Sequence, residues 1–511
     1  DPALVSAVLT AFDAMGVTRQ RMTLDSRTVR SGDVFVAVPG GRADGRDFVD
    51  AALHAGAAAV LSEVGDADSA VLIADTPIMV DAARRVIHVS ALHRVMGTIA
   101  DAFYDHPSRS MRVYGVTGTN GKTSIANWLA QALSRPDAPC AAVGTLGVSL
   151  GNQTWPTHNT TPDAVHLQTI LRDLRDAGAT QVAMEVSSHA LELHRVRGVH
   201  IHAAIFTNLT QDHLDFHGTM VAYGAAKTKL FTDFTPQHRV INADDAFGLD
   251  LLARNMAGTL SYGLNAGDVR GTLVAMTARG MTLDIAWRGA GVRVETPLIG
   301  RFNASNLLAV AACLLADGLA LPVVAQRLAM LTAAPGRMQR VVAEARDVPA
   351  VYVDYAHTPD ALSKAIDTVR ETAPASLAVV FGCGGDRDRS KRPLMGSIAS
   401  TRADRVVITS DNPRSEAPDA IIADIAAGID PARLDACTAV LARRDAIANT
   451  IAAADARDAV LIAGKGHETY QEVNGRREPF SDVAEAHAAL AAWVNTRRGQ
   501  ASTQGGAHVG R

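Results

Sequence analysis

The sequence predicts an α/β protein of three domains. Its 511 residues exceed what a single hydrophobic core supports, and three domains fit that length. Short apolar runs of strand length alternate with amphipathic helical stretches over most of the chain. This alternation is typical of parallel sheets that are covered by helices on both faces. A break in the pattern near residue 335 separates two such sheets.

Each predicted domain is bounded by a change in this pattern. Residues 1–108 mix short strands and helices, so we expect a small mixed α/β domain there. A new strand and a glycine-rich turn open the second domain, 109–335. A Pro-Gly pair follows its last helix, and further strand–helix units predict a third domain over 336–497. The polar, glycine-rich segment 498–511 predicts a disordered tail.

The individual elements follow from periodicity. Apolar runs bounded by turn residues predict strands, and apolar residues at helical spacing predict helices. In the first domain we expect a strand at 33–38, and a helix followed by a buried strand within 47–63. In the second domain we expect strands at 111–114, 139–147, 180–188 and 202–210, and helices at 124–133, 165–178 and 223–231. In the third domain we expect strands that begin near 350, 376, 404 and 459.

Composition argues against several classes of protein. The formal net charge of −4 provides no basic field for a nucleic-acid backbone. No apolar run approaches the roughly 20 residues that cross a bilayer, and the first residues lack the features of a signal peptide. The four cysteines form no CxxC pair, so we expect reduced thiols. We therefore expect a cytoplasmic protein without a nucleic-acid or membrane partner, and we expect it to be a monomer.

Residues 115–123 read GVTGTNGKT and lie between an expected strand and an expected helix. Gly118 and Gly121 allow a tight turn whose N–H groups point into one concavity, and the amides at the helix start add positive charge there. Lys122 can reach the β- and γ-phosphates, and the Thr123 hydroxyl can bind Mg²⁺. The usual pattern GxxxxGK[ST] has glycine where this chain has Val116.

An ordinary glycine turn with a solvated lysine is the alternative for this segment, but the flanking strand and helix favour a nucleoside triphosphate site. The residues that would form it are Gly118, Thr119, Asn120, Gly121, Lys122 and Thr123.

Three further side chains of the second domain are candidates. Glu185 lies near the end of a strand, where a carboxylate beside a triphosphate is a suitable Mg²⁺ ligand, although an acid at a helix start is the alternative. His213 lies in TNLTQDHLDFHG, where acids and histidines gather after a strand, and this density favours a function over a polar loop. Lys227 lies on a helix, and its residue type alone favours a solvated lysine.

Four polar loops follow strands of the third domain. They are DYAHTPDAL, GCGGDRDRSKRP, DNPRSEAP and GKGHE. Ligands of parallel sheets bind beyond the carboxyl ends of the strands. Arg387 and Arg414 can each hold a carboxylate through two parallel hydrogen bonds. A charged surface loop is the alternative for each loop, but four of them at strand ends predict a second substrate site facing the nucleotide.

Taken in order, these motifs resemble those of the Mur ligases. The matching segments are GTNGKT, EVSSH, TNL-x-x-DHLD-x-HG with the following AAK, RFNASN, GRMQ, DYAHTPDAL, GCGGDRD, DNPR and GKGHE, from about residue 24 to 483. The resemblance implies a small mixed α/β N-terminal domain for a UDP-sugar precursor and a central P-loop ATPase domain with a mainly parallel sheet. It also implies a Rossmann-like C-terminal α/β domain for an amino acid.

The resemblance implies a reaction as well. DNPR resembles the motif of the family member that adds meso-2,6-diaminopimelate to UDP-N-acetylmuramoyl-L-alanyl-D-glutamate in peptidoglycan synthesis. ATP would phosphorylate the D-glutamyl γ-carboxylate, the amine of diaminopimelate would attack the acyl phosphate, and a tetrahedral intermediate would lose phosphate. ATP and Mg²⁺ are the implied cofactors, and Mg²⁺ would neutralise the converging anions.

Residue roles carry over only through the matched motifs. Lys122, Glu185, His213 and Lys227 are the implied catalytic residues. Thr123, Glu185 and His213 would bind the metal, together with Lys227 after carbamylation, which turns an ammonium into an anionic oxygen ligand. The residues that resemble further ATP contacts are Asn306, Arg337, Asp354 and His357.

Two substrate sets also carry over. The residues that match contacts to the UDP precursor are Ser26, Asn159, Thr160, Thr161, Ser187 and Arg195, although Leu193 stands where the family often has Gln. The residues that match the diaminopimelate site are Arg387, Asp411, Asn412, Pro413, Arg414, Gly464 and Glu468. Diaminopimelate differs from lysine by a distal carboxylate, which a guanidinium such as that of Arg414 is suited to hold.

Two other functions fit part of the pattern. A folylpolyglutamate synthetase-like ligase would share the ATPase core and the chemistry, but LDSR in the first domain and DNPR in the last speak against it. A nucleotide-dependent switch or transport ATPase would need no amino-acid site. Phosphate release distinguishes the classes, because a ligase releases phosphate only when precursor and amino acid are both present.

Overall fold

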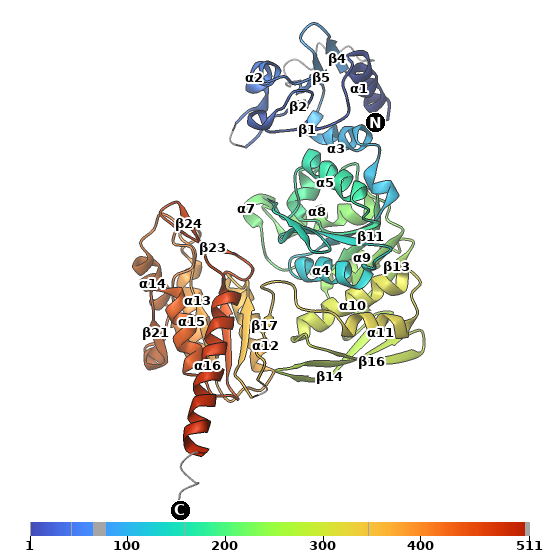
Figure 1. Ribbon diagram of the computed structural model, residues 1–511. Coiled ribbons are helices and arrows are strands. Elements are labelled where there is room, and N and C mark those ends of the chain that lie inside the picture. The colour runs from blue at the N-terminus through green and yellow to red at the C-terminus, as the bar shows by residue number, and fades with distance from the viewer. Residues whose placement is uncertain (1, 42, 65–77, 158, 346, 506–511) are drawn as a thin grey trace, which may run out of the picture. The chain divides into compact units, whose positions relative to one another are not determined.

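The computed structural model describes residues 2–41, 43–64, 78–157, 159–345 and 347–505 (Figure 1). The chain forms two compact units. The first contains residues 1–270, 286–290 and 306–324, and the second contains 271–285, 291–305 and 325–511.

A five-stranded sheet forms the N-terminal part of the first unit, in the order β1-β2-β3-β5-β4. All neighbours are parallel except β4 and β5. Helices α1 and α3 share one core with this sheet, and α2 covers Phe35 and Val60. The elements are α1 Pro2–Ala14, β1 Met22–Thr23, β2 Val34–Ala37, α2 Val49–His54, β3 Ala59–Glu63, β4 Ile78–Asp81, β5 Val86–Val89 and α3 Leu92–Phe103. The predicted strand at 33–38 and helix–strand pair within 47–63 are confirmed.

The central sheet has a parallel core in the order β13-β12-β11-β6-β10-β7. Antiparallel strands β8 (Gly147–Leu150) and β9 (Gln153–Trp155) continue it beyond β7. The core strands are β6 Arg112–Thr117, β7 Cys140–Gly144, β10 Gln181–Glu185, β11 Ile201–Phe206, β12 His238–Asn242 and β13 Thr259–Gly263. The predicted strands of this domain are confirmed, and the segments after β6, β10 and β11 leave the sheet at the same edge.

The helices of the central region connect these strands. They are α4 Lys122–Leu133, α5 Ala164–Asp176, α6 Ser188–Glu192, α7 Leu214–His217, α8 Met220–Thr232 and α9 Ala246–Leu252. Strands β14 (Val269–Thr277), β15 (Gly280–Trp287) and β16 (Ala290–Thr296) follow, and then helices α10 (Arg301–Ala316) and α11 (Leu321–Ala329).

A six-stranded sheet forms the core of the second unit, in the order β17-β18-β22-β19-β20-β21. Its neighbours are parallel except β17 and β18. The strands are β17 Gln339–Val341, β18 Ala350–Asp354, β19 Leu377–Phe381, β20 Arg405–Ile408, β21 Cys437–Ala439 and β22 Ala459–Ala463. The helices are α12 Pro359–Arg370, α13 Lys391–Arg402, α14 Pro418–Ala426, α15 Arg443–Ala452 and α16 Asp482–Gly505, and β23 (Tyr470–Val473) and β24 (Arg476–Pro479) form a hairpin.

The last helix differs from the expectation for the tail. Disorder was expected from residue 498, but α16 continues to Gly505. Arg, Gln and Ala in this segment tolerate a helix that has already begun, because extending a helix costs less than starting one. Residues 506–511 lie outside the described part of the chain.

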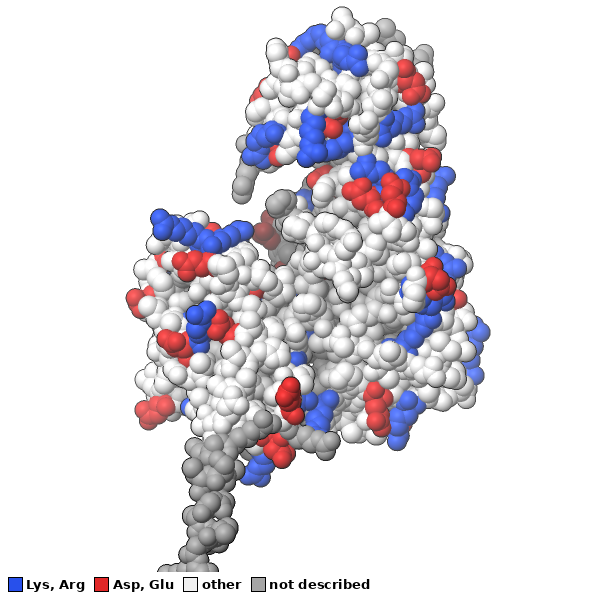
Figure 2. Space-filling model, in the orientation of Figure 1, with Lys and Arg blue, Asp and Glu red and all other residues white. Residues whose placement is uncertain are grey.

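Basic and acidic side chains are interspersed over the face of the molecule shown in Figure 2. Within the described residues, no helix is both long and apolar enough to cross a membrane. All four cysteines are free thiols, as predicted, and Cys140, Cys313 and Cys383 are buried.

A buried ion pair joins two helices of the second unit to its sheet. The side chains of Arg443, at the start of α15, and Asp482, at the start of α16, are both 0% exposed. The guanidinium donates two hydrogen bonds of 2.7 Å to the carboxylate and one of 2.9 Å to the carbonyl of Ala463 at the end of β22. Removing one partner would leave the other charge buried and unpaired.

We expect Arg443→Ala to lower the free energy of unfolding by about 3–5 kcal/mol, because the Asp482 carboxylate loses its buried partner. The matched control is Arg444→Ala, since Arg444 pairs with Glu485 and its side chain is 65% exposed. That variant should change the free energy by less than about 1 kcal/mol. Denaturant unfolding of both proteins measures the difference, and equal stabilities would contradict the prediction.

Candidate active site

The glycine-rich turn joins β6 to α4 in a conformation that only glycine fits. Gly118 has a φ of +147° and Gly121 a φ of +90°. A Cβ on Gly118 would lie 1.8 Å from the hydroxyl of Thr207, and one on Gly121 would lie 2.6 Å from the amide oxygen of Asn306. Val116, where the usual pattern has glycine, lies inside β6 and is buried, so the strand accommodates its side chain.

The segment after β11 holds this turn in place. The hydroxyl of Thr207 donates to the carbonyl of Asn120 at 2.6 Å, and the side-chain oxygen of Asn208 accepts from the Asn120 N–H at 3.0 Å. The Thr119 hydroxyl donates to the carbonyl of Thr210 at 3.2 Å. The conformation of the turn therefore depends on the TNL segment as well as on its own glycines.

Two lysine ammonium groups converge on the turn. Lys122 Nζ donates to the carbonyls of Gly118 at 2.8 Å and Thr119 at 2.9 Å, and Lys227 Nζ donates to the same Gly118 carbonyl at 3.0 Å. Lys227 is 1% exposed and lies over the ring of Tyr223, with 4.3 Å from Nζ to the ring centroid. The alternative interpretation of Lys227 as a solvated lysine is therefore wrong.

The environment of Lys227 changes its acid–base chemistry. Burial, and then the neighbouring Lys122 ammonium, lower the pKa of Lys227 well below its usual value. A lowered pKa favours the neutral amine, which is the nucleophilic form that carbamylation requires.

Glu185 lies beside the start of α4. Its carboxylate accepts a hydrogen bond from the Thr123 hydroxyl at 3.0 Å and another from the Thr145 N–H at 2.7 Å, and the residue is 2% exposed. A Cβ on Gly144 would lie 2.2 Å from this carboxylate, so glycine leaves the room it needs. A hydroxyl and a carboxylate in contact are the hard oxygen ligands that Mg²⁺ prefers, so these residues fit the ion.

His213 adopts a left-handed backbone conformation, with a φ of +53°, directly before α7. Burial lowers its pKa, which the Asp212 carboxylate opposes and the Lys122 and Lys227 charges reinforce. The imidazole is therefore neutral near pH 7 and able to bind a metal. Within the described residues no hydrogen bond joins it to Glu185, and its ring contacts that of His189 at a centroid distance of 4.8 Å.

Three of the residues expected to bind the UDP precursor meet at the carboxyl end of β10. The Thr161 hydroxyl donates to the carbonyl of Glu185 at 2.9 Å and accepts from the N–H of Ser187 at 3.1 Å. Arg195 donates to the carbonyl of Thr161 at 3.2 Å. These residues therefore share one polar network with the Glu185 backbone.

The other three precursor candidates are less closely connected to this network. The Thr160 hydroxyl lies 3.1 Å from that of Thr145, which links it to the Glu185 carboxylate. Asn159 is exposed, and Ser26 lies in a short 3-10 helix of the N-terminal part. Leu193 is 43% exposed and offers no polar group in place of the expected Gln.

In the second unit, three residues expected near ATP lie around the carboxyl end of β18. The Asp354 carboxylate accepts hydrogen bonds from two backbone N–H groups at 2.7 and 2.9 Å, and burial raises its pKa. The guanidinium of Arg337 lies over the ring of Tyr355, 4.5 Å from its centroid. His357 is bound at 2.8 Å to the carbonyl of Tyr355, and burial lowers its pKa.

His467 belongs to the same group, although sequence reasoning did not single it out. Its ring lies 5.2 Å from that of Tyr355, and burial, with the Arg337 charge, lowers its pKa to about 4. Its Nδ1 is buried and has no hydrogen-bond partner among the described residues. A buried, neutral imidazole nitrogen without a partner is suited to a ligand's hydrogen-bond donor.

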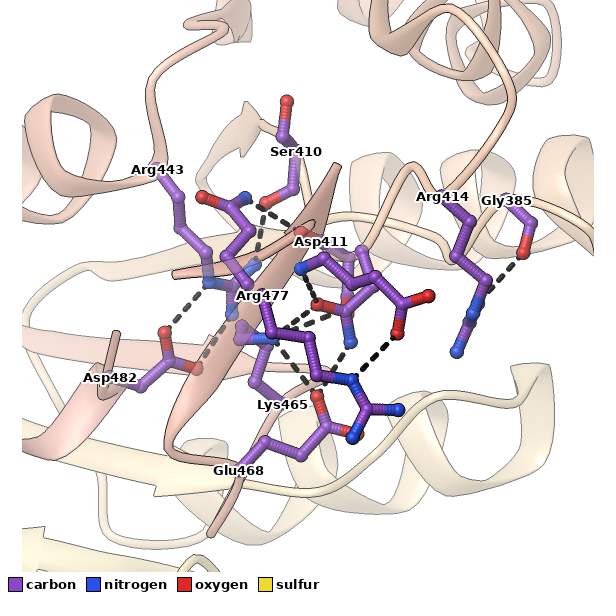
Figure 3. A network of polar contacts seen from close by, with 12 residues as sticks. Gly385, Ser410, Asp411, Arg414, Arg443, Lys465, Glu468, Arg477 and Asp482 are labelled. Carbon is purple, nitrogen blue, oxygen red and sulfur yellow. Dashed lines mark hydrogen bonds and ion pairs between the residues drawn. The ribbon is translucent and has the colours of Figure 1, made fainter. Parts of the chain in front are cut away.

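The loops after β19 and β20 bring together the residues expected to bind diaminopimelate. A Cβ on Gly384 would lie 2.9 Å from the Arg414 guanidinium and 3.7 Å from the Arg387 side chain, so both arginines flank this glycine. Arg414 has a φ of +51° and donates to the carbonyl of Gly385 at 2.7 Å (Figure 3). A Cβ on Gly385 would lie 1.9 Å from the carbonyl oxygen of Pro413, so only glycine fits at this position.

The β23–β24 hairpin fixes this loop through its backbone. The Arg414 N–H donates to the carbonyl of Glu472 at 3.0 Å, and the Asn474 N–H donates to the carbonyl of Arg414 at 2.7 Å. The side-chain amide of Gln471 donates to the carbonyl of Asp411 at 2.6 Å. The hairpin therefore binds both the N–H and the carbonyl of Arg414.

A buried lysine lies at the centre of the network in Figure 3. The Lys465 side chain is 0% exposed, and its ammonium donates at 2.9 Å to the side-chain oxygen of Asn412 and at 2.9 Å to the Glu468 carboxylate. The Asp411 carboxylate lies 3.8 Å away. The Asn412 amide donates to Glu468 at 2.7 Å, so its orientation is fixed. One buried cation thus faces two carboxylates, which leaves a net negative charge suited to an ammonium group.

Comparison with known proteins gives the family. The model described as the Mur ligase middle domain matches residues 116–314, that of the Mur ligase glutamate ligase domain matches 336–466, and that of the Mur ligase family catalytic domain matches 20–104. The chain belongs to the Mur ligase family. The resemblance noted in the sequence is thus confirmed, and so is the three-domain α/β fold.

Similar Mur ligases cover nearly the whole chain. The UDP-N-acetylmuramoyl-L-alanyl-D-glutamate–2,6-diaminopimelate ligase of Chromobacterium violaceum is 47% identical over 499 residues, which are 96% of this chain and 97% of that protein. The ligase of the same name from Pseudomonas aeruginosa is 47% identical over 479 residues, or 93% and 95% of the two chains. A solved structure of a ligase with this name has a TM-score of 0.67 at 38% identity and covers 92% of this chain and 94% of its own.

Several residues that shape the site escaped the sequence-based selection. Thr207 and Asn208 support the P-loop, Lys465 organises the loops of the second unit, and His467 lies beside Tyr355. These residues belong to the motifs TNL and GKGHE, so the motifs could have identified them. Which of these side chains is buried, however, depends on tertiary packing.

We expect Gly118→Ala to weaken ATP binding more than ten-fold, because a Cβ there would displace Thr207 and with it the P-loop. Gly151→Ala is the control, since Gly151 also has a positive φ, +58°, but a Cβ there would meet nothing within 4 Å. Titration with a non-hydrolysable ATP analogue measures both affinities. A Gly118→Ala protein that binds as well as the control would refute this role of the glycine.

We expect Lys465→Met to weaken binding of the amino-acid substrate at least about ten-fold, because Asp411 and Glu468 would lose the cation between them and Asn412 a hydrogen bond. Lys364→Met is the control, since Lys364 forms an exposed pair with Asp360. Calorimetric titration with diaminopimelate measures the affinity, and thermal unfolding shows whether each variant folds. Unchanged affinity in a folded Lys465→Met protein would count against the assignment.

Proposed function

We propose that this Mur ligase uses ATP to join meso-2,6-diaminopimelate to the D-glutamyl γ-carboxylate of UDP-N-acetylmuramoyl-L-alanyl-D-glutamate. The observation that carries the proposal is the 47% identity, over 96% of the chain, to a ligase with that name. The placement of Arg387 and Arg414 beside Gly384 supports it, because each guanidinium can bind a carboxylate and the substrate has two.

The proposed reaction has two steps. A γ-carboxylate oxygen attacks the terminal phosphorus of ATP, and ADP leaves. The neutral amine of diaminopimelate then attacks the acyl carbon, and the tetrahedral intermediate expels inorganic phosphate and loses a proton. Lys122 is the group that would hold the transferring phosphoryl group, because its ammonium already lies against the P-loop carbonyls.

Mg²⁺ fits the oxygen groups of Thr123 and Glu185, and it would offset the charge of the phosphates. His213 is a further candidate ligand. A carbamate on Lys227 would add anionic oxygens beside the P-loop, and the lowered pKa of this lysine supports that modification. The protein's own residues would therefore provide both the cations and the anions of the site.

The domains and remaining partners follow from the same proposal. Residues 1–108, with Ser26, would bind the uridine nucleotide, residues 109–335 would bind ATP, and residues 336–497 would bind the amino acid. The Thr160, Thr161, Ser187 and Arg195 group is suited to the peptide part of the precursor. We infer a monomer in the cytoplasm, where ATP and nucleotide-linked precursors are available.

The purified protein with ATP, Mg²⁺, the UDP-muramoyl dipeptide and a panel of amino acids tests the proposal. Phosphate release and the mass of the product should both require the dipeptide together with diaminopimelate, and lysine should be used poorly. Phosphate release without either substrate would favour a switch ATPase, and extension of a folate substrate would favour a folylpolyglutamate synthetase-like ligase.

We expect Arg414→Ala to raise the Michaelis constant for diaminopimelate by about 10- to 100-fold, since a charged hydrogen-bond donor is lost, and to leave ATP affinity within about two-fold. Arg389→Ala is the control, because Arg389 lies on the neighbouring loop, pairs with Asp424 and is 64% exposed. Steady-state kinetics of both variants measure the effect. An unchanged Michaelis constant in Arg414→Ala would show that Arg414 does not bind the distal carboxylate.

A further inference from the structure

A second cluster of ligand-type side chains lies in the first unit, at the opposite ends of the central strands from the P-loop. His202 is the second residue of β11, His238 is the first residue of β12, and Asp317 follows the last residue of α10. The P-loop, by contrast, follows the carboxyl end of β6. The cluster is therefore separate from the nucleotide site.

A β-bulge explains why the two histidines meet. Between β11 and β6 the register steps from Ile201–Val113 to Ala203–Tyr114, so His202 is an extra residue on β11. Without the bulge, neighbouring residues of a strand would face opposite sides of the sheet. The extra residue brings the His202 ring edge-to-face against those of Tyr114 and His238, at centroid distances of 5.4 and 5.2 Å.

The ligand atoms of the three residues lie within 4.8 Å of one another. His202 Nε2 is 2.7 Å from Asp317 Oδ1, and His238 Nε2 is 3.9 Å from the same oxygen. The side chains are 11%, 18% and 2% exposed for His202, His238 and Asp317. Tyr114 donates its hydroxyl to the other Asp317 oxygen, which orients the carboxylate.

The charges of the cluster suit a cation. Asp317 places one carboxylate against two imidazoles, and ring nitrogens and carboxylate oxygens are donors that divalent cations accept. Arg112, 4.0 Å from Asp317, is 60% exposed and can turn towards solvent.

A purely hydrogen-bonded network leaves one member unexplained. Asp317 already accepts from His202 and Tyr114, whereas His238 makes no side-chain hydrogen bond to any described residue. Its Nε2 nevertheless lies 3.9 Å from the carboxylate oxygen that His202 also contacts. Two imidazoles and one carboxylate are the donor set of many zinc sites.

We propose that His202, His238 and Asp317 form a binding site for a Zn²⁺ ion. Ligand atoms about 2.0–2.1 Å from a tetrahedral ion lie about 3.3–3.4 Å apart. His202 Nε2, now 2.7 Å from Asp317 Oδ1, would therefore move away by about 0.6 Å, and His238 Nε2, now 3.9 Å from it, would approach by about 0.5 Å. The proton on His202 Nε2 would pass to Nδ1, which frees Nε2 for the metal without a net proton release. Water would fill the fourth position on the exposed side of His238.

The bound ion would join β11, β12 and the end of α10. The first turns of that helix carry Asn306, whose amide oxygen would lie 2.6 Å from a Cβ on Gly121. We therefore expect Zn²⁺ to stabilise the central fold against unfolding rather than to take part in catalysis.

Calorimetric titration of the chelator-treated full-length protein with Zn²⁺ tests the proposal. The wild-type chain should bind one Zn²⁺ ion at the cluster. The variants His238→Gln and Asp317→Asn should lose this ion or bind it at least about 100-fold more weakly, because even residues that only orient metal ligands contribute 10–100-fold to affinity. His487→Ala, an exposed histidine of α16, should bind like the wild type. Zn²⁺ held near Glu185 and His213 would persist in all variants, so the difference isolates the cluster.

Two further measurements keep the result interpretable. Asp317→Asn retains an acceptor for Tyr114 and should fold, which circular dichroism checks, and Zn²⁺ should raise the melting temperature of the wild type but not of this variant. X-ray absorption should detect two imidazoles and one carboxylate around the metal. Identical Zn²⁺ isotherms for the wild type and Asp317→Asn, or no binding by the wild type at micromolar concentrations, would overturn the proposal.

Discussion

The nucleotide site depends on one constraint, which is that two lysine side chains reach a single backbone carbonyl. Lys122 and Lys227 both donate to the carbonyl of Gly118, and Lys227 is almost fully buried. Two ammonium groups this close repel each other, so the arrangement is stable only if one loses its proton or anions arrive. The lowered pKa of Lys227 meets the first condition, and a triphosphate bound as we propose would meet the second.

In the second unit the charges are reversed, because one buried cation lies between two carboxylates. Asp411 and Glu468 are carboxylates of neighbouring loops, and the buried Lys465 ammonium between them keeps both loops in place. Because one cation faces two anions, part of the negative charge remains for a ligand. This part of the loops therefore suits the ammonium group of a ligand, whereas Arg414 nearby suits a carboxylate.

Much of this arrangement could be predicted from the sequence because motif spacing reflects strand ends. GTNGKT, EVSSH and TNL follow neighbouring parallel strands, and the structure gathers Thr123, Glu185 and Thr207 accordingly. The burial of Lys227 and Lys465 could not be predicted from residue type, since a lysine on a helix or in a turn is normally solvated. The contact between His202 and His238 depends on a bulge in β11, and no sequence pattern predicted this bulge. The precise domain boundaries at 108 and 335 stay predictions.

The hairpin β23–β24 gives the molecule an indirect route to a new substrate preference. It holds Arg414 by backbone hydrogen bonds at Glu472 and Asn474, and it reaches Asp411 through Gln471. A change in hairpin length or register would move the Arg414 guanidinium without replacing any of the residues that we propose bind the amino acid. The hairpin thus acts as an adjustable support for the arginine, since its length determines where the Arg414 backbone is anchored.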